Sequence, residues 1–92
     1  MSLSNYTYIK DTLSEAALCE QLAEECGELA HACLKKARKI RGENPTPLTE
    51  NDIDDMIEEE FTDVMLVCNM LGLSIDFGTY YKKIDRWADR LS

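Results

Sequence analysis

The chain has 92 residues, 45% of them hydrophobic, which is enough for one compact domain and too few for two, so a single domain over residues 1–92 is predicted. Acidic residues outnumber basic ones by 18 to 10, and the net charge of −8 argues against nucleic acid as a partner, since phosphate backbones require a basic surface. No apolar run is long enough to span a membrane. The four cysteines form no CxxC pair and no signal peptide is recognisable, which together predict a cytoplasmic location.

The first half of the chain is dominated by one predicted helix. Residues 1–11 are expected to form an extended or short helical arm that packs through Tyr6, Tyr8 and Ile9. Residues 12–41 contain no proline, and Asp11 or Thr12 is expected to cap a long helix that ends at Gly42. Apolar residues recur in it at steps of three and four, which is typical of an amphipathic helix: Leu18, Leu22, Cys26, Leu29, Cys33, Ala37 and Ile40. Cys19, Cys26 and Cys33, spaced seven residues apart, are expected to be small core residues.

Two further helices are predicted after a turn at residues 42–47, which hold two prolines and a glycine. Thr49 and Asp52 form a capping box for a helix that extends to Gly72, and a third helix begins near Asp76 and continues to Leu91. The predicted fold is therefore an all-α bundle of one long helix and two others. Because residues 64–71 are apolar on nearly every face, we expect the bundle to be completed in a homodimer or homotetramer.

Four carboxylates lie where the helical pattern calls for apolar residues. Glu60 interrupts the stripe that contains Ile53 and Val67, and Asp63 directly precedes the apolar run. Glu25 interrupts the stripe of the long helix, and Glu28 lies on the same side of it. Burying ionised carboxylates costs several kcal/mol each unless a cation accompanies them. Since hard oxygen ligands select Mg²⁺, or Mn²⁺, over zinc, the pattern predicts such an ion among these four residues.

Other interpretations of the acidic residues stay open. The two pairs could lie at the edge of the core and extend into water without any metal. Glu28 and His31 also match the Glu-x-x-His motif of di-iron bundles, in which the motif occurs on two helices. Here the second pair ends in Asp63, an asymmetry that favours Mg²⁺ over di-iron, and a lone histidine is more often a surface or packing residue.

The segments EECGEL at residues 24–29 and EEFTDV at residues 59–64 resemble the paired ExxE and ExxD motifs of MazG-like nucleotide pyrophosphohydrolases, over about residues 15–90. The resemblance implies a MazG-like helical bundle in which Mg²⁺ is bound by Glu25, Glu28, Glu60 and Asp63. It further implies that Glu24 and Glu25 act in catalysis, with Glu24 orienting or deprotonating water. The implied reaction converts a nucleoside triphosphate, expected to be a dNTP, to the monophosphate and pyrophosphate.

The same resemblance implies a phosphate-binding group on the last helix. Lys83, Arg86 and Arg90 match it, with Lys82 as a substitute, although they also fit an ordinary solvated basic face. Trp87 departs from the asparagine that family members often carry in this segment, which leaves the matching of this helix open. Asn69 could contact the base or ribose instead, or make a polar contact between helices.

Two alternative functions remain at this point. One is phosphoribosyl-ATP pyrophosphohydrolase, although the chain lacks the basic residue before the first glutamates and the aromatic-histidine pair after the second aspartate that are associated with that enzyme. The other is a non-catalytic helical interaction or regulatory module, whose carboxylates bind a metal only for stability or not at all.

Overall fold

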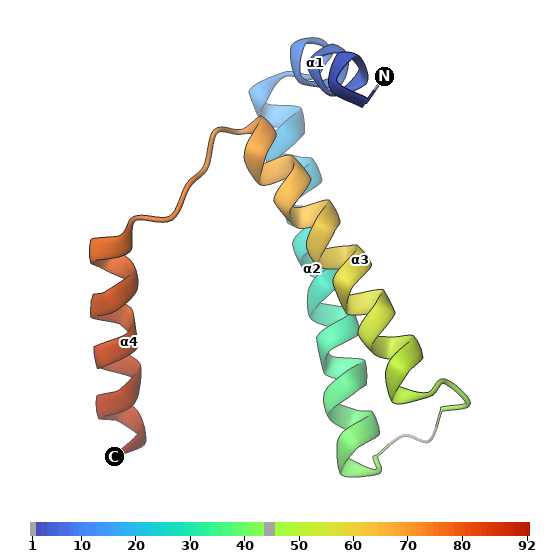
Figure 1. Cartoon of the computed structure of the whole chain (residues 1–92), viewed down its shortest axis with the longest axis vertical. Coiled ribbons are helices and arrows are strands. Elements are labelled where there is room, and N and C mark those ends of the chain that lie inside the picture. Colours follow the sequence, from blue (N-terminus) through green and yellow to red (C-terminus); the bar gives the residue numbers. More distant parts are fainter. Residues whose placement is uncertain (1, 44–45) are drawn as a thin grey trace.

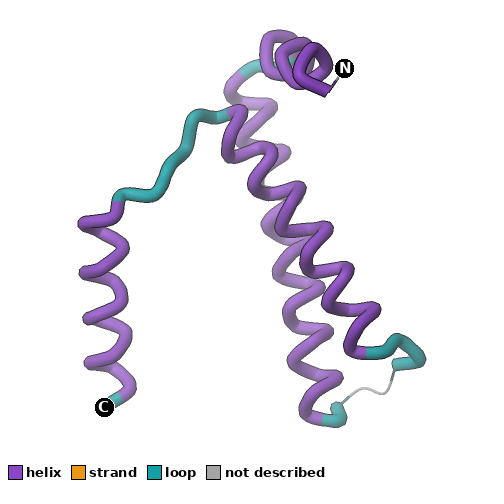
Figure 2. The backbone as a smooth tube through the Cα atoms, viewed as in Figure 1, coloured by secondary structure: helices purple, strands orange, loops and turns teal. Residues whose placement is uncertain are grey.

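The structure is a computed structural model that describes residues 2–43 and 46–92, and this part of the chain contains helices and no strands (Figures 1 and 2). The helices are α1 (Ser2–Thr12), α2 (Glu15–Arg41), α3 (Glu50–Met70) and α4 (Phe77–Leu91). The prediction of an all-α chain is therefore confirmed, and the N-terminal arm is a helix. None of the described helices is long and apolar enough to cross a membrane. The predicted turn at residues 42–47 connects α2 to α3, but its residues Asn44 and Pro45 lie outside the described part.

The helices α2 and α3 form an antiparallel hairpin and lie side by side along most of their length (Figure 1). Three of their buried residues come from the predicted apolar stripes: Leu18, Ile53 and Val67. Met70 lies within the predicted apolar run at residues 64–71, and Ala32 was not predicted as a core residue. Ile53 is completely buried, and Leu18, Val67 and Met70 form a cluster near the α1 end of the hairpin. Tyr6 from α1 packs against this cluster, so the short first helix is attached to the hairpin through its own apolar side.

The helix ends follow their capping residues. Ser14 caps α2 by accepting a hydrogen bond from the Ala17 N–H at 3.1 Å, so the predicted cap at Asp11 or Thr12 is wrong. Those two residues belong to α1, because the chain turns between the two helices and does not form one continuous helix. Gly42 ends α2 with φ = 74°, a backbone conformation that glycine adopts without steric cost. The predicted capping box of Thr49 and Asp52 is present at the start of α3.

The prediction that the cysteines of α2 are core residues is wrong. Cys19, Cys26 and Cys33 are all exposed. Each directly follows a buried or half-buried residue of the face turned to α3, and one residue corresponds to a rotation of about 100° around a helix. The three cysteines therefore repeat with the same period as the interface residues but lie on the neighbouring, exposed side of α2.

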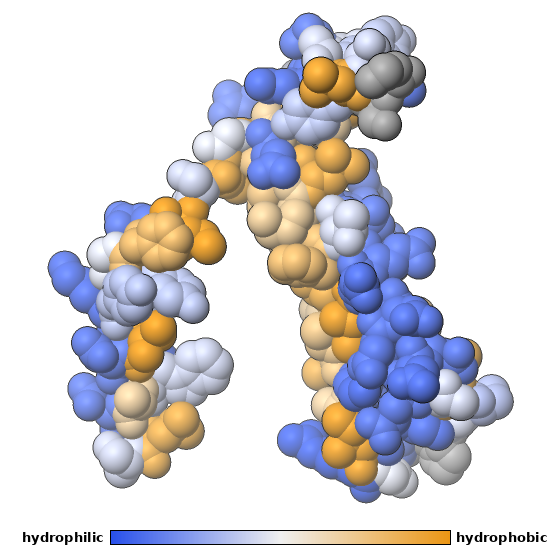
Figure 3. Space-filling view, viewed as in Figure 1, coloured by the Kyte–Doolittle hydropathy of each residue, from blue (hydrophilic) through white to orange (hydrophobic). Residues whose placement is uncertain are grey.

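The last helix, α4, lies away from the hairpin and is exposed along its whole length (Figure 1). Apolar side chains gather on the side of α4 that is turned toward the hairpin, and apolar surface also follows the facing side of the hairpin (Figure 3). On α3, Met65 and Leu66 are 42% and 44% exposed, so the apolar run at residues 64–71 is only partly enclosed in one chain. The exposed apolar residues of α4 are Phe77, Tyr80, Tyr81, Ile84, Trp87 and Leu91.

Candidate metal centre

The structure brings the four predicted carboxylates together between α2 and α3. Glu25 and Glu28 are three residues apart on α2, and Glu60 and Asp63 have the same spacing on the antiparallel α3. Residues three apart share a helix face, so each helix presents a pair of carboxylates to the other. One oxygen from each of the four side chains lies within 4.8 Å of the others. Glu25, Glu60 and Asp63 are half-buried, and Glu28 is exposed.

The carboxylate cluster has more negative oxygens than hydrogen-bond donors. Gln21 Nε2 donates a hydrogen bond of 2.7 Å to Glu25 Oε1. The other oxygen of Glu25 and the Oε2 atom of Glu60 are inaccessible to solvent and have no hydrogen-bond partner among the described residues. Buried polar atoms in proteins nearly always have a partner, so two such oxygens in one cluster make it a candidate site for a positively charged ligand.

The pKa of Glu60 reflects the same imbalance. Burial raises the pKa of this carboxyl above its ordinary value, and a hydrogen bond shared with Glu28 raises the pKa further. The negative charges of Glu28, Asp63 and Glu25 act in the same direction. Like charges held close together make the ionised form less favourable, and a bound cation would reverse that effect.

The dimensions of the cluster fit one divalent ion. Oxygens on opposite sides of Mg²⁺ are separated by about 4.2 Å, because each lies about 2.1 Å from the metal. The four carboxylates of this hairpin already fall within 4.8 Å of one another, so small side-chain movements would place them around such an ion. An all-oxygen set of this kind suits Mg²⁺ or Mn²⁺, and no histidine or cysteine of the described chain joins the group. The paired Glu-x-x-His arrangement of a di-iron site is therefore not formed by these residues.

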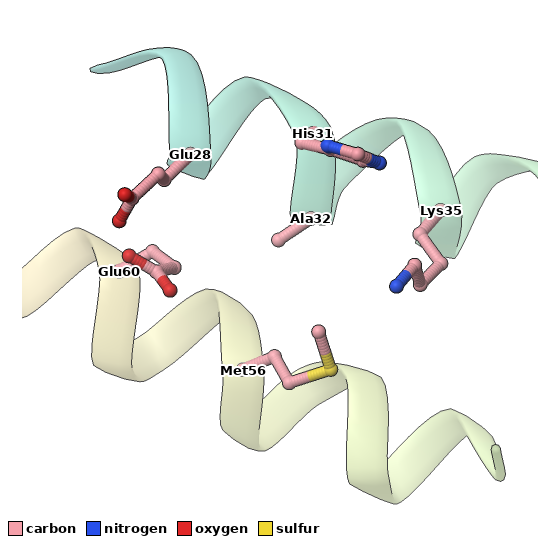
Figure 4. Close-up of a pocket in the computed structure, with 6 residues that line it drawn as sticks. All are labelled: Glu28, His31, Ala32, Lys35, Met56 and Glu60. Carbon is pink, nitrogen blue, oxygen red and sulfur yellow. The ribbon is translucent and has the colours of Figure 1, made fainter. Parts of the chain in front are cut away.

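One cavity lies beside the cluster on the side of Glu28 and Glu60 (Figure 4). Its volume is about 180 Å³, and His31, Ala32, Lys35 and Met56 complete its walls. The amine of Lys35 points into the space between the two helices, while the carboxylates of Glu28 and Glu60 face each other (Figure 4). Lys35 was not predicted as a site residue. Its position seven residues after Glu28, two helical turns along the same face, is the signal that could have identified it.

Several predicted site residues lie outside the cluster. Glu24 is exposed on α2 next to Glu25 and is not one of the four converging carboxylates. Asn69 is exposed on α3, nearly two turns beyond Asp63. The predicted phosphate-binding residues are on α4, which lies away from the hairpin within one chain (Figure 1): Lys82, Lys83, Arg86 and Arg90.

Comparisons of the chain with protein families, with curated proteins and with solved structures found no match. The chemistry of the site is therefore inferred from its own side chains. Two antiparallel helices hold four carboxylates around a point where two oxygens have no partner among the described residues. Lys35 lines the adjoining cavity and forms no ion pair within the described part of the chain. This arrangement can bind a divalent cation and, through it, an anionic ligand.

Proposed function

We propose that the chain is a Mg²⁺-dependent, MazG-like nucleotide pyrophosphohydrolase that converts a nucleoside triphosphate, and specifically a dNTP, to the monophosphate and pyrophosphate. The observation that carries this proposal is the convergence of Glu25, Glu28, Glu60 and Asp63, with two buried oxygens left unpaired. The order and spacing of the two acidic motifs on consecutive helices support the same family.

The four converging carboxylates would hold Mg²⁺, or Mn²⁺ in its place. When bound, the ion neutralises charge on phosphate oxygens and lowers the pKa of water. Gln21 fixes the orientation of Glu25 by its hydrogen bond, and the exposed carboxylate of Glu24 is free to accept a proton from the attacking water. The water oxygen forms a bond to the α phosphorus while the bond to the α–β bridging oxygen breaks, which releases pyrophosphate.

An activity screen tests the proposal. Purified protein is incubated with Mg²⁺ and each common nucleoside triphosphate, and released pyrophosphate is measured. We expect turnover of at least one dNTP and its loss in Glu60→Gln, whereas Glu58→Gln, on an exposed residue of the same helix, should retain it. Absence of pyrophosphate release from every nucleotide, or full turnover by Glu60→Gln, would contradict the proposal.

The same screen separates the alternatives. Pyrophosphate release from phosphoribosyl-ATP and from no dNTP would identify the enzyme of histidine synthesis. A non-catalytic module, whose carboxylates bind Mg²⁺ only for stability or not at all, would bind no nucleotide analogue in calorimetric titrations.

We also propose that a second copy of the chain covers the apolar side of α4, in a homodimer or homotetramer. An isolated helix of 15 residues is marginal in water, yet α4 exposes six large apolar side chains. Residues 77–91 carry four basic and two acidic residues, whereas residues 15–70 carry 14 acidic and five basic ones, so the two regions attract each other. Light scattering at micromolar concentration should show a dimer or tetramer, and a stable monomer would contradict this assembly.

The proposed location is the reducing cytoplasm. All four cysteines are free, and three of them are exposed. Exposed thiols persist where glutathione and thioredoxin keep them reduced. The proposed nucleotide substrates are found in the same compartment.

A further inference from the structure

Two cavities adjoin the carboxylate cluster, one on each side along the hairpin, and their walls differ in chemistry. The cavity at Glu28 and Glu60 is also lined by Lys35, whose amine points into the space between the helices, and by His31 (Figure 4). The other cavity, at Glu25 and Asp63, has a volume of about 280 Å³ and lies toward α1. Its remaining walls are apolar except for Gln21: Ile9, Leu13, Leu18, Leu66, Val67 and Met70.

From this contrast we infer that the ligand lies along the hairpin, with its phosphates toward Lys35 and its organic group in the cavity beneath α1. The inference rests on the proposed function and extends it to the binding mode of the substrate. A phosphate chain requires donors and positive charge, which only the Lys35 side supplies. A heterocyclic ring requires apolar walls with a few polar groups, which only the α1 side supplies.

Lys35 is suited to an anionic ligand because no carboxylate of the described chain forms an ion pair with it. Its neighbour Lys36 bonds to both Glu50 and Asp54 at the hairpin surface. Lys35 is instead half-buried, and its amine is directed into the cavity (Figure 4). A lysine in this position can donate a charge-assisted hydrogen bond to a phosphate oxygen that enters the cavity next to the proposed metal ligands.

The α1 cavity is suited to a ring because its apolar walls are incompletely covered. Ile9 is 40% exposed, Leu13 41% and Leu66 44%, so a flat group that enters would remove apolar surface from water. The volume of about 280 Å³ is near the lower limit of about 300 Å³ for small-molecule pockets, which suits one base and not a large ligand. Gln21 donates one side-chain N–H to Glu25. Its second N–H and its carbonyl oxygen remain available to contact the polar edge of a base.

Binding measurements with two probes test this orientation. Calorimetric titrations with excess Mg²⁺ use inorganic triphosphate, which has no organic group, and the α,β-methylene analogues of dTTP and dATP. Lys35→Met should weaken the binding of inorganic triphosphate and of both analogues by about tenfold or more. Ile9→Ser should weaken only the nucleotide analogues, by about fivefold, and leave inorganic triphosphate unchanged.

Matched controls come from the same helices. Lys39→Met removes a lysine one turn beyond Lys35 that does not line the cavity, and Tyr8→Ser removes a 69% exposed side chain next to Ile9. Both controls should bind all probes as the wild type does, and circular dichroism should show unchanged helix content in all four variants.

The outcomes separate two kinds of failure. If the wild type binds the probes but Lys35→Met has no effect, or Ile9→Ser weakens inorganic triphosphate as much as the nucleotides, the orientation is wrong and the proposed function stands. If the wild type binds no probe in the presence of Mg²⁺, the orientation and the proposed function are both overturned.

Discussion

The hairpin of α2 and α3 and the single helix α4 use amphipathic sequence in different ways. In the hairpin, two apolar stripes pack against each other, and four carboxylates interrupt them at one level. In α4, the apolar stripe contains no carboxylate, is rich in aromatic residues and is left uncovered by the described residues of the same chain. A stripe with acidic interruptions is thus suited to a ligand between helices, whereas an uninterrupted aromatic stripe is suited to packing against another surface.

The largest effect on assembly is expected from removing the tryptophan of the α4 stripe. Trp87→Ser should raise the dissociation constant of the oligomer by at least about 30-fold, because buried tryptophans are frequent interface hot spots. Sedimentation or light scattering over a dilution series measures the change. Asp85→Ser, on the polar side of the same helix, is the control and should leave the assembly intact. Equal dissociation constants for the two variants would show that the apolar side of α4 does not form the interface.

Within the hairpin, packing should dominate stability. Ile53 is completely buried, so Ile53→Ala should lower the free energy of unfolding by about 3 kcal/mol, through lost apolar contact and a residual cavity. Urea denaturation followed by circular dichroism measures the difference. Leu34→Ala, at a residue that is 58% exposed on α2, should cost less than about 0.5 kcal/mol. A comparable loss in both variants would mean that the hairpin interface is wrongly placed.

A smaller effect is expected at the start of α3. Thr49→Ala removes the side chain that accepts the Asp52 N–H bond and should cost about 1 kcal/mol. The hydrogen bond from the Thr49 N–H lowers the pKa of the Asp52 carboxyl below 3.8. The ionised carboxylate therefore stabilises the fold fully above pH 3.8, and this stabilisation is lost as the pH falls through the lowered pKa. Asp52→Asn should therefore weaken the loss of stability in acid, as measured by urea denaturation between pH 5 and 2. An unchanged acid response would exclude this cap as its source.

Much of the hairpin could be predicted because its signals are local. Proline-free stripes, the capping box at Thr49 and the glycine at position 42 fixed where the helices lie, to within three residues. The convergence of Glu25, Glu28, Glu60 and Asp63 followed from equal spacing on two consecutive helices joined by a short turn. These features depend on backbone geometry and on the period of the sequence alone.

Other features depend on partners that the sequence does not specify. The spacing of Cys19, Cys26 and Cys33 matched a core stripe, but the face that meets α3 lies one residue earlier. The position of Lys35 in the cavity could not be predicted, because it is one of five basic residues at the end of α2, where the helix dipole alone explains a cation. The position of α4, and with it that of Lys83, Arg86 and Arg90, depends on the surface against which this helix packs.

The central claim is that a divalent cation offsets the repulsion among the four carboxylates, and thermal unfolding at neutral pH with EDTA or with Mg²⁺ tests it most directly. The raised pKa of Glu60 means that its ionised form destabilises the metal-free fold at this pH, so Glu60→Gln should have a higher Tm than the wild type in EDTA. Mg²⁺ should raise the Tm of the wild type and of the control Glu58→Gln, and leave that of Glu60→Gln nearly unchanged. A wild-type Tm that does not respond to Mg²⁺, or that responds no more than Glu60→Gln does, would contradict the account.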